Sequence, residues 1–85
     1  MSASLAGLRP AAFLAAFRHS FGISPMRYVM TQRLRLACSL LASTRQDITA
    51  IALATGFSSH SHLTAAFRQH FGTTPREYRA QVKGL

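Results

Sequence analysis

The sequence predicts an all-α fold in which two related helical units are joined by a long helix. The first observation is an internal repeat, because residues 13–28 (FLAAFRHSFGISPMRY) recur fifty positions later as residues 63–78 (LTAAFRQHFGTTPREY), with eight of sixteen positions identical. The second is that glycine, proline or a capping residue stands at the boundaries of five expected helices, with no strands between them. A repeat of this kind indicates one supersecondary unit used twice.

The first unit is expected to contain a single helix over residues 10–20. Phe13, Phe17 and Phe21 fall on one face of it at helical spacing, and Gly22 is placed to act as its C-cap. Ser24 precedes a proline, which predicts an N-cap and a long helix from residue 25 to about residue 42. At about 1.5 Å per residue that helix would span about 27 Å and act as a rigid strut. Its buried stripe is expected to include Tyr28, Val29, Leu36, Ala37, Leu40 and Leu41.

The second unit is expected to contain three shorter helices. Asp47 caps a helix over residues 48–55 that ends at Gly56, and Ser58 or Ser59 caps a helix that runs to about residue 70. Thr74, Pro75 and Glu77 then predict a last helix with a capping box. The apolar side chains expected to point inward are Ile48, Ile51, Ala52, Phe57, Leu63, Phe67 and Phe71. The first two of these helices, with the turn at residues 54–59, form a helix-turn-helix, whose second helix typically enters the major groove of DNA.

The charge of the chain favours a polyanionic partner. The chain has ten Lys and Arg residues and two acidic residues, which gives a net charge of +8. Apolar residues make up 48% of the chain, which is enough for a core. A field of this sign favours nucleic acid or an acidic membrane surface, and the alternative is a basic surface without a partner. The single Cys38 cannot form an internal disulfide, so a reducing cytoplasm fits best.

The residues offer little for catalysis or for a metal or other cofactor. His60 and His62 lie two positions apart, about 200° around a helix, which suits them poorly to one metal ion. Both acids, Asp47 and Glu77, are used at helix starts, so no pair of carboxylates remains for acid–base chemistry. Cys38 has no evident base beside it and is interpreted as a small packed hydrophobe. We therefore expect no enzyme, no cofactor and no metal site.

Residues 48–79 (ITAIALATGFSSHSHLTAAFRQHFGTTPREYR) resemble the second helix-turn-helix of the AraC/XylS-type bacterial transcription regulators. The matching motifs are IAxxxGF at 51–57, SHSHL at 59–63, the FR and FG pairs and TPxxYR. The long helix adds Tyr28, Arg33, Leu34, Ala37 and Leu41 in the same register. The resemblance implies tandem helix-turn-helix units of homeodomain-like type in a cytoplasmic regulator that binds double-stranded DNA. Their two recognition helices would enter successive major-groove segments about 34 Å apart.

The resemblance covers nearly the whole chain and divides it into three parts. Residues 1–24 would be a remnant of the first helix-turn-helix, residues 25–43 the linker helix and residues 44–85 the second helix-turn-helix. Only residues 5–7 precede the first recognition helix, so that unit is expected to lack most of its supporting helices. We expect the chain to be the C-terminal part of a regulator, shortened by truncation, a misplaced start codon or engineering. It would carry no small-molecule effector site and no membrane segment, and RNA polymerase is a further candidate partner.

The resemblance also assigns DNA-contacting residues, on the face of helix 59–70 opposite its apolar stripe and on the equivalent face of helix 10–20. The candidate base-reading residues are His60, Ser61, Thr64 and Ala65 in the second unit, and Ala11, Leu14 and Ala15 in the first. The candidate backbone-contacting residues are Ser58, Ser59, His62 and Arg68, with Arg9 and Arg18 in the first unit. For Arg68 the alternative is a bracing role inside the domain. The alternative function is a truncated, non-functional fragment or a basic helical fragment that binds proteins or anionic membranes.

Overall fold

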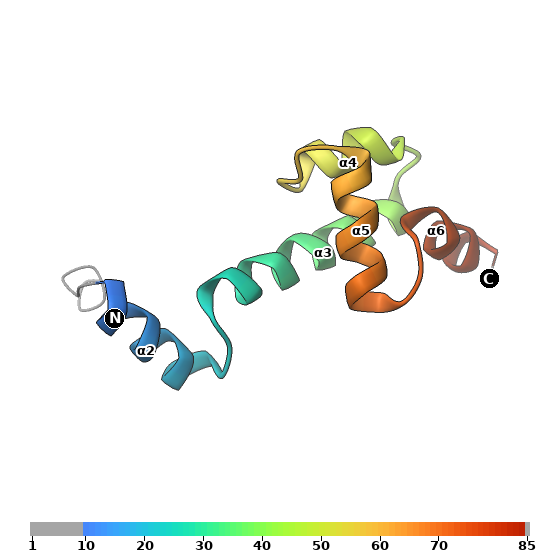
Figure 1. Cartoon of the computed structure of the whole chain (residues 1–85). Helices are drawn as coiled ribbons and strands as arrows, with labels where there is room; N and C mark the ends of the chain where they lie inside the picture. Colours follow the sequence, from blue (N-terminus) through green and yellow to red (C-terminus); the bar gives the residue numbers. More distant parts are fainter. Residues whose placement is uncertain (1–9, 85) are drawn as a thin grey trace. The chain divides into compact units, whose positions relative to one another are not determined.

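The computed structural model describes residues 10–84, and within this range it contains five helices and no strand, as the sequence predicts. In chain order the helices are α2 (Pro10–Phe21), α3 (Pro25–Ser43), α4 (Ile48–Ala54), α5 (His60–Phe71) and α6 (Pro75–Lys83) (Figure 1). Each predicted boundary lies within one residue of the observed one. None of the helices described here has the length and apolarity that a bilayer-spanning segment requires.

The chain forms two compact units that divide inside α3, after Thr31. The first unit contains α2 and the start of α3. The second unit contains the rest of α3 together with α4, α5 and α6, and within it α5 packs against both α4 and α6. The boundary therefore separates the two copies of the repeat.

The end of each repeated helix has the same geometry in the two units. Gly22 and Gly72 have φ angles of 79° and 78°, in the left-handed region that glycine adopts without a steric penalty. Their backbone N–H groups donate to the carbonyl oxygens of Arg18 and Arg68 at 2.7 and 2.8 Å. These bonds satisfy carbonyls that the helix end would otherwise leave unpaired. The predicted C-caps are therefore confirmed in both copies.

An aromatic pair also recurs in the two units. The rings of Phe17 and Tyr28 lie 5.7 Å apart at 69°, and those of Phe67 and Tyr78 lie 5.6 Å apart at 63°. Edge contacts of this type suit the ring quadrupole. The burial differs, because Phe67 is fully buried whereas Phe17 is only half-buried. The two copies thus share the aromatic contact, but the phenylalanine is less buried in the first copy than in the second.

The buried core of the second unit is formed by α3, α4, α5 and the turn between α4 and α5. The helix α3 contributes at i, i+3 and i+7 spacing, which keeps its three side chains on one face. The buried apolar residues are Leu34, Ala37, Leu41, Ile51, Ala52, Phe57, Leu63 and Phe67.

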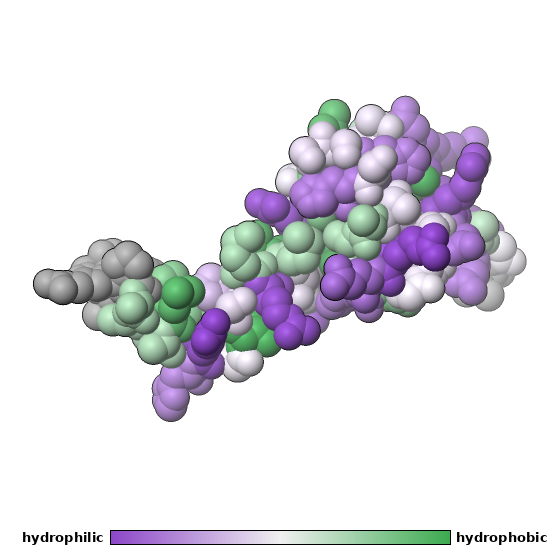
Figure 2. Space-filling model, viewed as in Figure 1, coloured by the Kyte–Doolittle hydropathy of each residue, from purple (hydrophilic) through white to green (hydrophobic). Residues whose placement is uncertain are grey.

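Several residues predicted for the core lie at the surface instead. Leu36 is 50% exposed, Val29 is 41% exposed and Tyr28 is 37% exposed, so half of the predicted stripe of α3 is wrong. Leu36 follows the buried Leu34 by two positions, about 200° around the helix, and the two cannot share a face. Phe71 is also 41% exposed. Apolar side chains accordingly reach the surface in patches (Figure 2).

The turn of the helix-turn-helix is fixed by Thr55, Gly56 and Phe57. The hydroxyl of the buried Thr55 donates to the Ile51 carbonyl at 2.7 Å, which closes the end of α4. Gly56 follows with a φ of 95°, and a methyl group built on it would lie 2.8 Å from Nε of Arg33. The left-handed residue reverses the chain so that Phe57 enters the core at 3% exposure. This turn sets the position at which α5 begins.

Arg79 of α6 holds the end of α3. Its Nε donates to the Leu41 carbonyl at 3.1 Å and its Nη2 donates to the Thr44 carbonyl at 3.3 Å. The Leu41 carbonyl belongs to the last turn of α3 and Thr44 follows that helix directly, so the cation lies where the helix dipole is negative. Arg79 therefore fixes α6 to the connection between α3 and α4.

Glu77 completes the predicted capping box, which makes part of the stability depend on pH. Its carboxylate accepts from the Thr74 backbone N–H at 3.0 Å and from the Thr73 hydroxyl at 2.9 Å. The Thr74 N–H, then the threonine hydroxyls and the charge of Arg68, lower the pKa of Glu77 below its ordinary value. A lowered pKa in the folded state means that this stabilisation is present above the unfolded value, about 4.3. It is lost as the pH falls through the folded value.

We therefore expect Glu77→Gln to destabilise the chain at pH 7 and to cost less stability at pH 3 than at pH 7. The glutamine side chain can still accept a hydrogen bond, but it is uncharged at both pH values. Urea denaturation midpoints of the two proteins at pH 7 and pH 3 measure the difference, because the two proteins are identical at every other position. An equal gap at both pH values would show that the carboxylate charge contributes nothing.

Candidate nucleic-acid interface

The helix α5 is held by Leu63 and Phe67, both fully buried. With these side chains fixed in the core, the helix has one orientation and presents its opposite face outward. Of the predicted base-reading residues, His60, Ser61 and Ala65 are exposed and Thr64 is half-buried. Arg68 is exposed on the same face, one turn further along, and its charge also acts on Glu77 at the start of α6.

The start of α5 is organised by Ser58, Ser59 and His62. The Ser59 hydroxyl accepts from the His62 backbone N–H at 3.0 Å, which makes Ser59, rather than Ser58, the N-cap. The Ser58 backbone N–H donates to Nδ1 of His62 at 3.3 Å, and the Ser58 hydroxyl lies 3.1 Å from the same nitrogen. The imidazole also packs edge-on against Phe57, with ring centres 5.2 Å apart. The side chain of His62 is thus folded back on the turn.

This contact assigns the tautomer of neutral His62. A backbone N–H can only donate, so Nδ1 must carry the lone pair and Nε2 must carry the proton. The Nε2–H group is then the donor that this ring can offer to a phosphate oxygen. The contacts with Ser58 and Phe57 favour this orientation of the ring and therefore of its donor.

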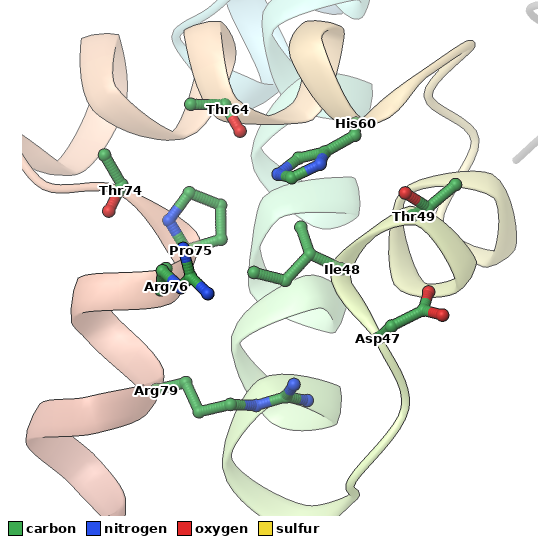
Figure 3. Close-up of a pocket in the computed structure, with 9 residues that line it drawn as sticks. All are labelled: Asp47, Ile48, Thr49, His60, Thr64, Thr74, Pro75, Arg76 and Arg79. Atoms are coloured by element: carbon green, nitrogen blue, oxygen red, sulfur yellow. The ribbon is translucent and has the colours of Figure 1, made fainter.

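A hollow of about 620 Å³ lies beside the outward face of α5. His60 and Thr64 point into it from α5, Ile48 lies across it from α4, and Pro75 and Arg76 line it from the start of α6 (Figure 3). Asp47, Thr49, Thr74 and Arg79 complete the lining. Arg76 was not among the residues predicted from the sequence. The signal that could have indicated it is the spacing of Arg76, Arg79 and Lys83, which places them on one face of a helix.

The corresponding face of α2 in the first unit carries few hydrogen-bonding groups. Ala11, Leu14 and Ala15 are exposed there, and Leu14 is 42% exposed. Arg18 is exposed near the end of the helix. Arg9 lies outside the described residues. Within the described residues, this face of the first unit thus consists of apolar surface and the cation of Arg18.

The described residues contain no group of three or more His, Cys, Asp or Glu side chains that could hold a metal ion. Burial raises the pKa of the Cys38 thiol, although its hydrogen bond with Tyr78 acts in the opposite direction. Burial likewise raises the pKa of the Tyr78 hydroxyl. Cys38 therefore remains a protonated thiol between α3 and α6, where it packs as a small side chain.

Comparison with known proteins identifies the family. Residues 2–81 match a helix-turn-helix domain family. A solved transcriptional regulator from Chromobacterium violaceum, described as containing an AraC-type DNA-binding domain, superposes with a TM-score of 0.81 at 39% identity, over 89% of this chain and 68% of the other. The chain belongs to the AraC-type family of helix-turn-helix transcription regulators.

Two further relatives show how much of an AraC-type protein this chain represents. The probable transcriptional regulator LumQ of Photobacterium leiognathi is 38% identical over 80 residues, which cover 94% of this chain and 32% of LumQ. The DNA-binding domain of the global transcriptional factor AdpA, solved in complex with a target DNA, superposes with a TM-score of 0.89 at 30% identity, over 93% of this chain and 71% of that domain. The chain thus spans about a third of the length of this curated relative.

Proposed function

We propose that this AraC-type chain binds double-stranded DNA with sequence preference and regulates transcription, with α5 lying in the major groove. The observation that carries the proposal is the outward face of α5, which the buried Leu63 and Phe67 orient, in a chain whose net charge is +8. An α-helix fits the major groove of B-DNA, and phosphate neutralisation supplies much of the affinity. RNA polymerase is the second partner we propose, and the cytoplasm is the compartment that the unpaired Cys38 favours.

In this proposal the base-reading groups lie at the start and centre of α5. The imidazole of His60 and the hydroxyl of Ser61 bond to base edges, and Thr64 adds a hydroxyl or a methyl contact. Ala65 offers only apolar contact, which suits the methyl group of thymine. These are the side chains that face outward once the core is packed.

The phosphate-binding groups surround the base-reading ones. Ser58 and Ser59 provide hydroxyls and backbone amides at the start of α5, and the Nε2–H of His62 is held beside them. Arg68 adds a cation at the far end of the same face. Such contacts fix the position of the protein on the duplex but carry no sequence information.

The first unit contributes less to sequence reading in this proposal. Residues 1–24 supply α2, whose Ala11, Leu14 and Ala15 provide shape and apolar contact, while Arg18 and Arg9 add charge. Residues 25–43 form the linker helix, and residues 44–85 form the working helix-turn-helix. The two recognition helices are therefore unequal.

The proposal predicts that His60→Ala relaxes base preference more than Leu14→Ala does. A base-edge hydrogen bond contributes about 1–3 kcal/mol of discrimination, so His60→Ala should reduce the preference for the best site by about 5- to 150-fold. Leu14→Ala should reduce it by less than about threefold. The best site is first selected from random duplexes, and anisotropy titrations then compare it with a scrambled duplex. A larger loss of preference from Leu14→Ala would contradict the proposal, and binding to anionic vesicles but not to duplex DNA would end it.

A further inference from the structure

A second hollow lies next to the one beside α5. It measures about 630 Å³ and is lined by Ala42, Thr44, Arg45, Arg79, Val82 and Lys83. Arg79 lines both hollows, so its side chain forms their common wall. The linings of the two hollows therefore meet at Arg79 and extend from His60 and Thr64 to Lys83 near the C-terminal end of α6.

Four cations lie along this surface, and we name them the basic strip. Arg76, Arg79 and Lys83 are spaced i, i+3 and i+7 on α6, which puts them on one face of that helix. Arg45 joins them from the connection between α3 and α4. Arg45, Arg76 and Lys83 are exposed, whereas Arg79 is half-buried and bonded to the end of α3.

The chain has few acids with which to neutralise the basic strip. Its only two acidic residues are Asp47 and Glu77. Asp47 lines the first hollow, but its carboxylate accepts from the Ala50 backbone N–H at 2.8 Å as the cap of α4. Glu77 is committed to the capping box of α6. The strip therefore keeps a net positive charge toward solvent.

We propose that the basic strip binds the sugar–phosphate backbone of the DNA that flanks the bases read by α5. This inference rests on the proposed function, because the strip begins at the hollow that His60 and Thr64 line. That continuity favours DNA over an acidic protein, since a duplex whose bases meet α5 brings its own phosphates to the adjoining surface. The strip lengthens the footprint beyond α5 and adds affinity that does not depend on sequence.

The test is the salt dependence of a variant that lacks the three exposed charges, Arg45→Ala, Arg76→Ala and Lys83→Ala. Arg79 stays unchanged because it braces the fold. Each phosphate contact contributes about 0.9 to the slope of log affinity against log salt. Between 50 and 200 mM salt, the affinity of the wild type should therefore fall by a factor about 40-fold larger than that of the triple variant. The preference for the best site over a scrambled duplex should remain that of the wild type.

Two controls separate the strip from the proposed function. Arg35→Ala removes one exposed charge from α3, outside the linings of both hollows, and should change the salt slope less than any single strip substitution does. The second control shortens the duplex to the best site alone. The wild type should lose affinity on the short duplex, while the triple variant should bind long and short duplexes alike.

The outcomes are distinct. If the wild type shows sequence preference that His60→Ala weakens, but the triple variant keeps the wild-type slope, the strip does not contact DNA and the proposed function stands. That result would point to an acidic protein surface as the occupant. If the wild type binds no duplex at 50 mM salt, the proposed function fails and the strip proposal fails with it.

Discussion

Replacing Phe67 with alanine is expected to unfold most of the second unit. Phe67 is fully buried and lies against Tyr78 and Phe71, with ring centres at 5.6 and 4.7 Å. Truncating a buried phenylalanine to alanine typically costs about 3–5 kcal/mol. At about 0.05–0.15 kcal/mol per residue, the 54 residues from Gln32 to Leu85 would hold only about 3–8 kcal/mol in total. The single truncation thus removes a large share of the stability.

Urea denaturation followed by circular dichroism measures this effect, with Phe71→Ala as the matched control on the same helix. Phe71 is 41% exposed, so its truncation leaves a smaller cavity and should cost less than about half as much. The unfolding of Phe67→Ala should begin without added urea, whereas Phe71→Ala should retain a cooperative transition. Equal losses in the two variants would mean that the core of this unit does not centre on Phe67.

The same pair of residues shows how far the sequence could predict the core. Leu63, Phe67 and Phe71 are spaced by four, which predicts that all three point inward. Each step of four advances about 400° around a helix, so Phe71 is rotated about 80° from Leu63. Phe71 is also the last residue of α5, immediately before the left-handed Gly72. The apolar residue type and the spacing correctly predicted the burial of Leu63 and Phe67. The exposure of Phe71 follows from its position at the end of the helix.

Helix boundaries were predictable because their causes are local. Asp47, Ser59, Thr74 and Gly72 act on backbone groups within four residues of themselves, so residue type and order contain the information. The outward face of α5 followed from the same periodicity. The assignment of DNA contacts on that face remains a prediction.

Tertiary contacts of the basic residues could not be predicted in this way. Arg79 bonds to the Leu41 and Thr44 carbonyls, 38 and 35 residues away, and nothing in its sequence neighbours indicates that pairing. Arg76 gained its place beside His60 only once α6 was packed against α5. The ten basic residues look alike by charge, but the fold divides those of α6 into one brace and two exposed cations.

Replacing Ala65 with glutamate is expected to weaken DNA binding by about 100-fold or more at 0.1 M salt. Ala65 is exposed near the middle of α5, between the turns that carry Ser61 and Arg68. Glutamate is a good helix former, so the fold should tolerate it. In the proposed complex its carboxylate would enter a groove bordered by phosphates, where like charges cost several kcal/mol. A loss of about 2.7 kcal/mol corresponds to the stated factor.

The matched control for this substitution is Gln81→Glu, which lowers the net charge by the same single unit. Gln81 is exposed on α6, on a different face from the basic strip, so its substitution should weaken binding less than about threefold. Anisotropy titrations on the selected duplex compare the two variants, and far-ultraviolet circular dichroism verifies that both retain their helices. Equal effects would mean that only the net charge of the protein matters. DNA binding driven by overall positive charge would be weakened by an added carboxylate at any position. A difference of thirtyfold or more would place the centre of α5 against the DNA, since only proximity to the phosphates distinguishes the two carboxylates.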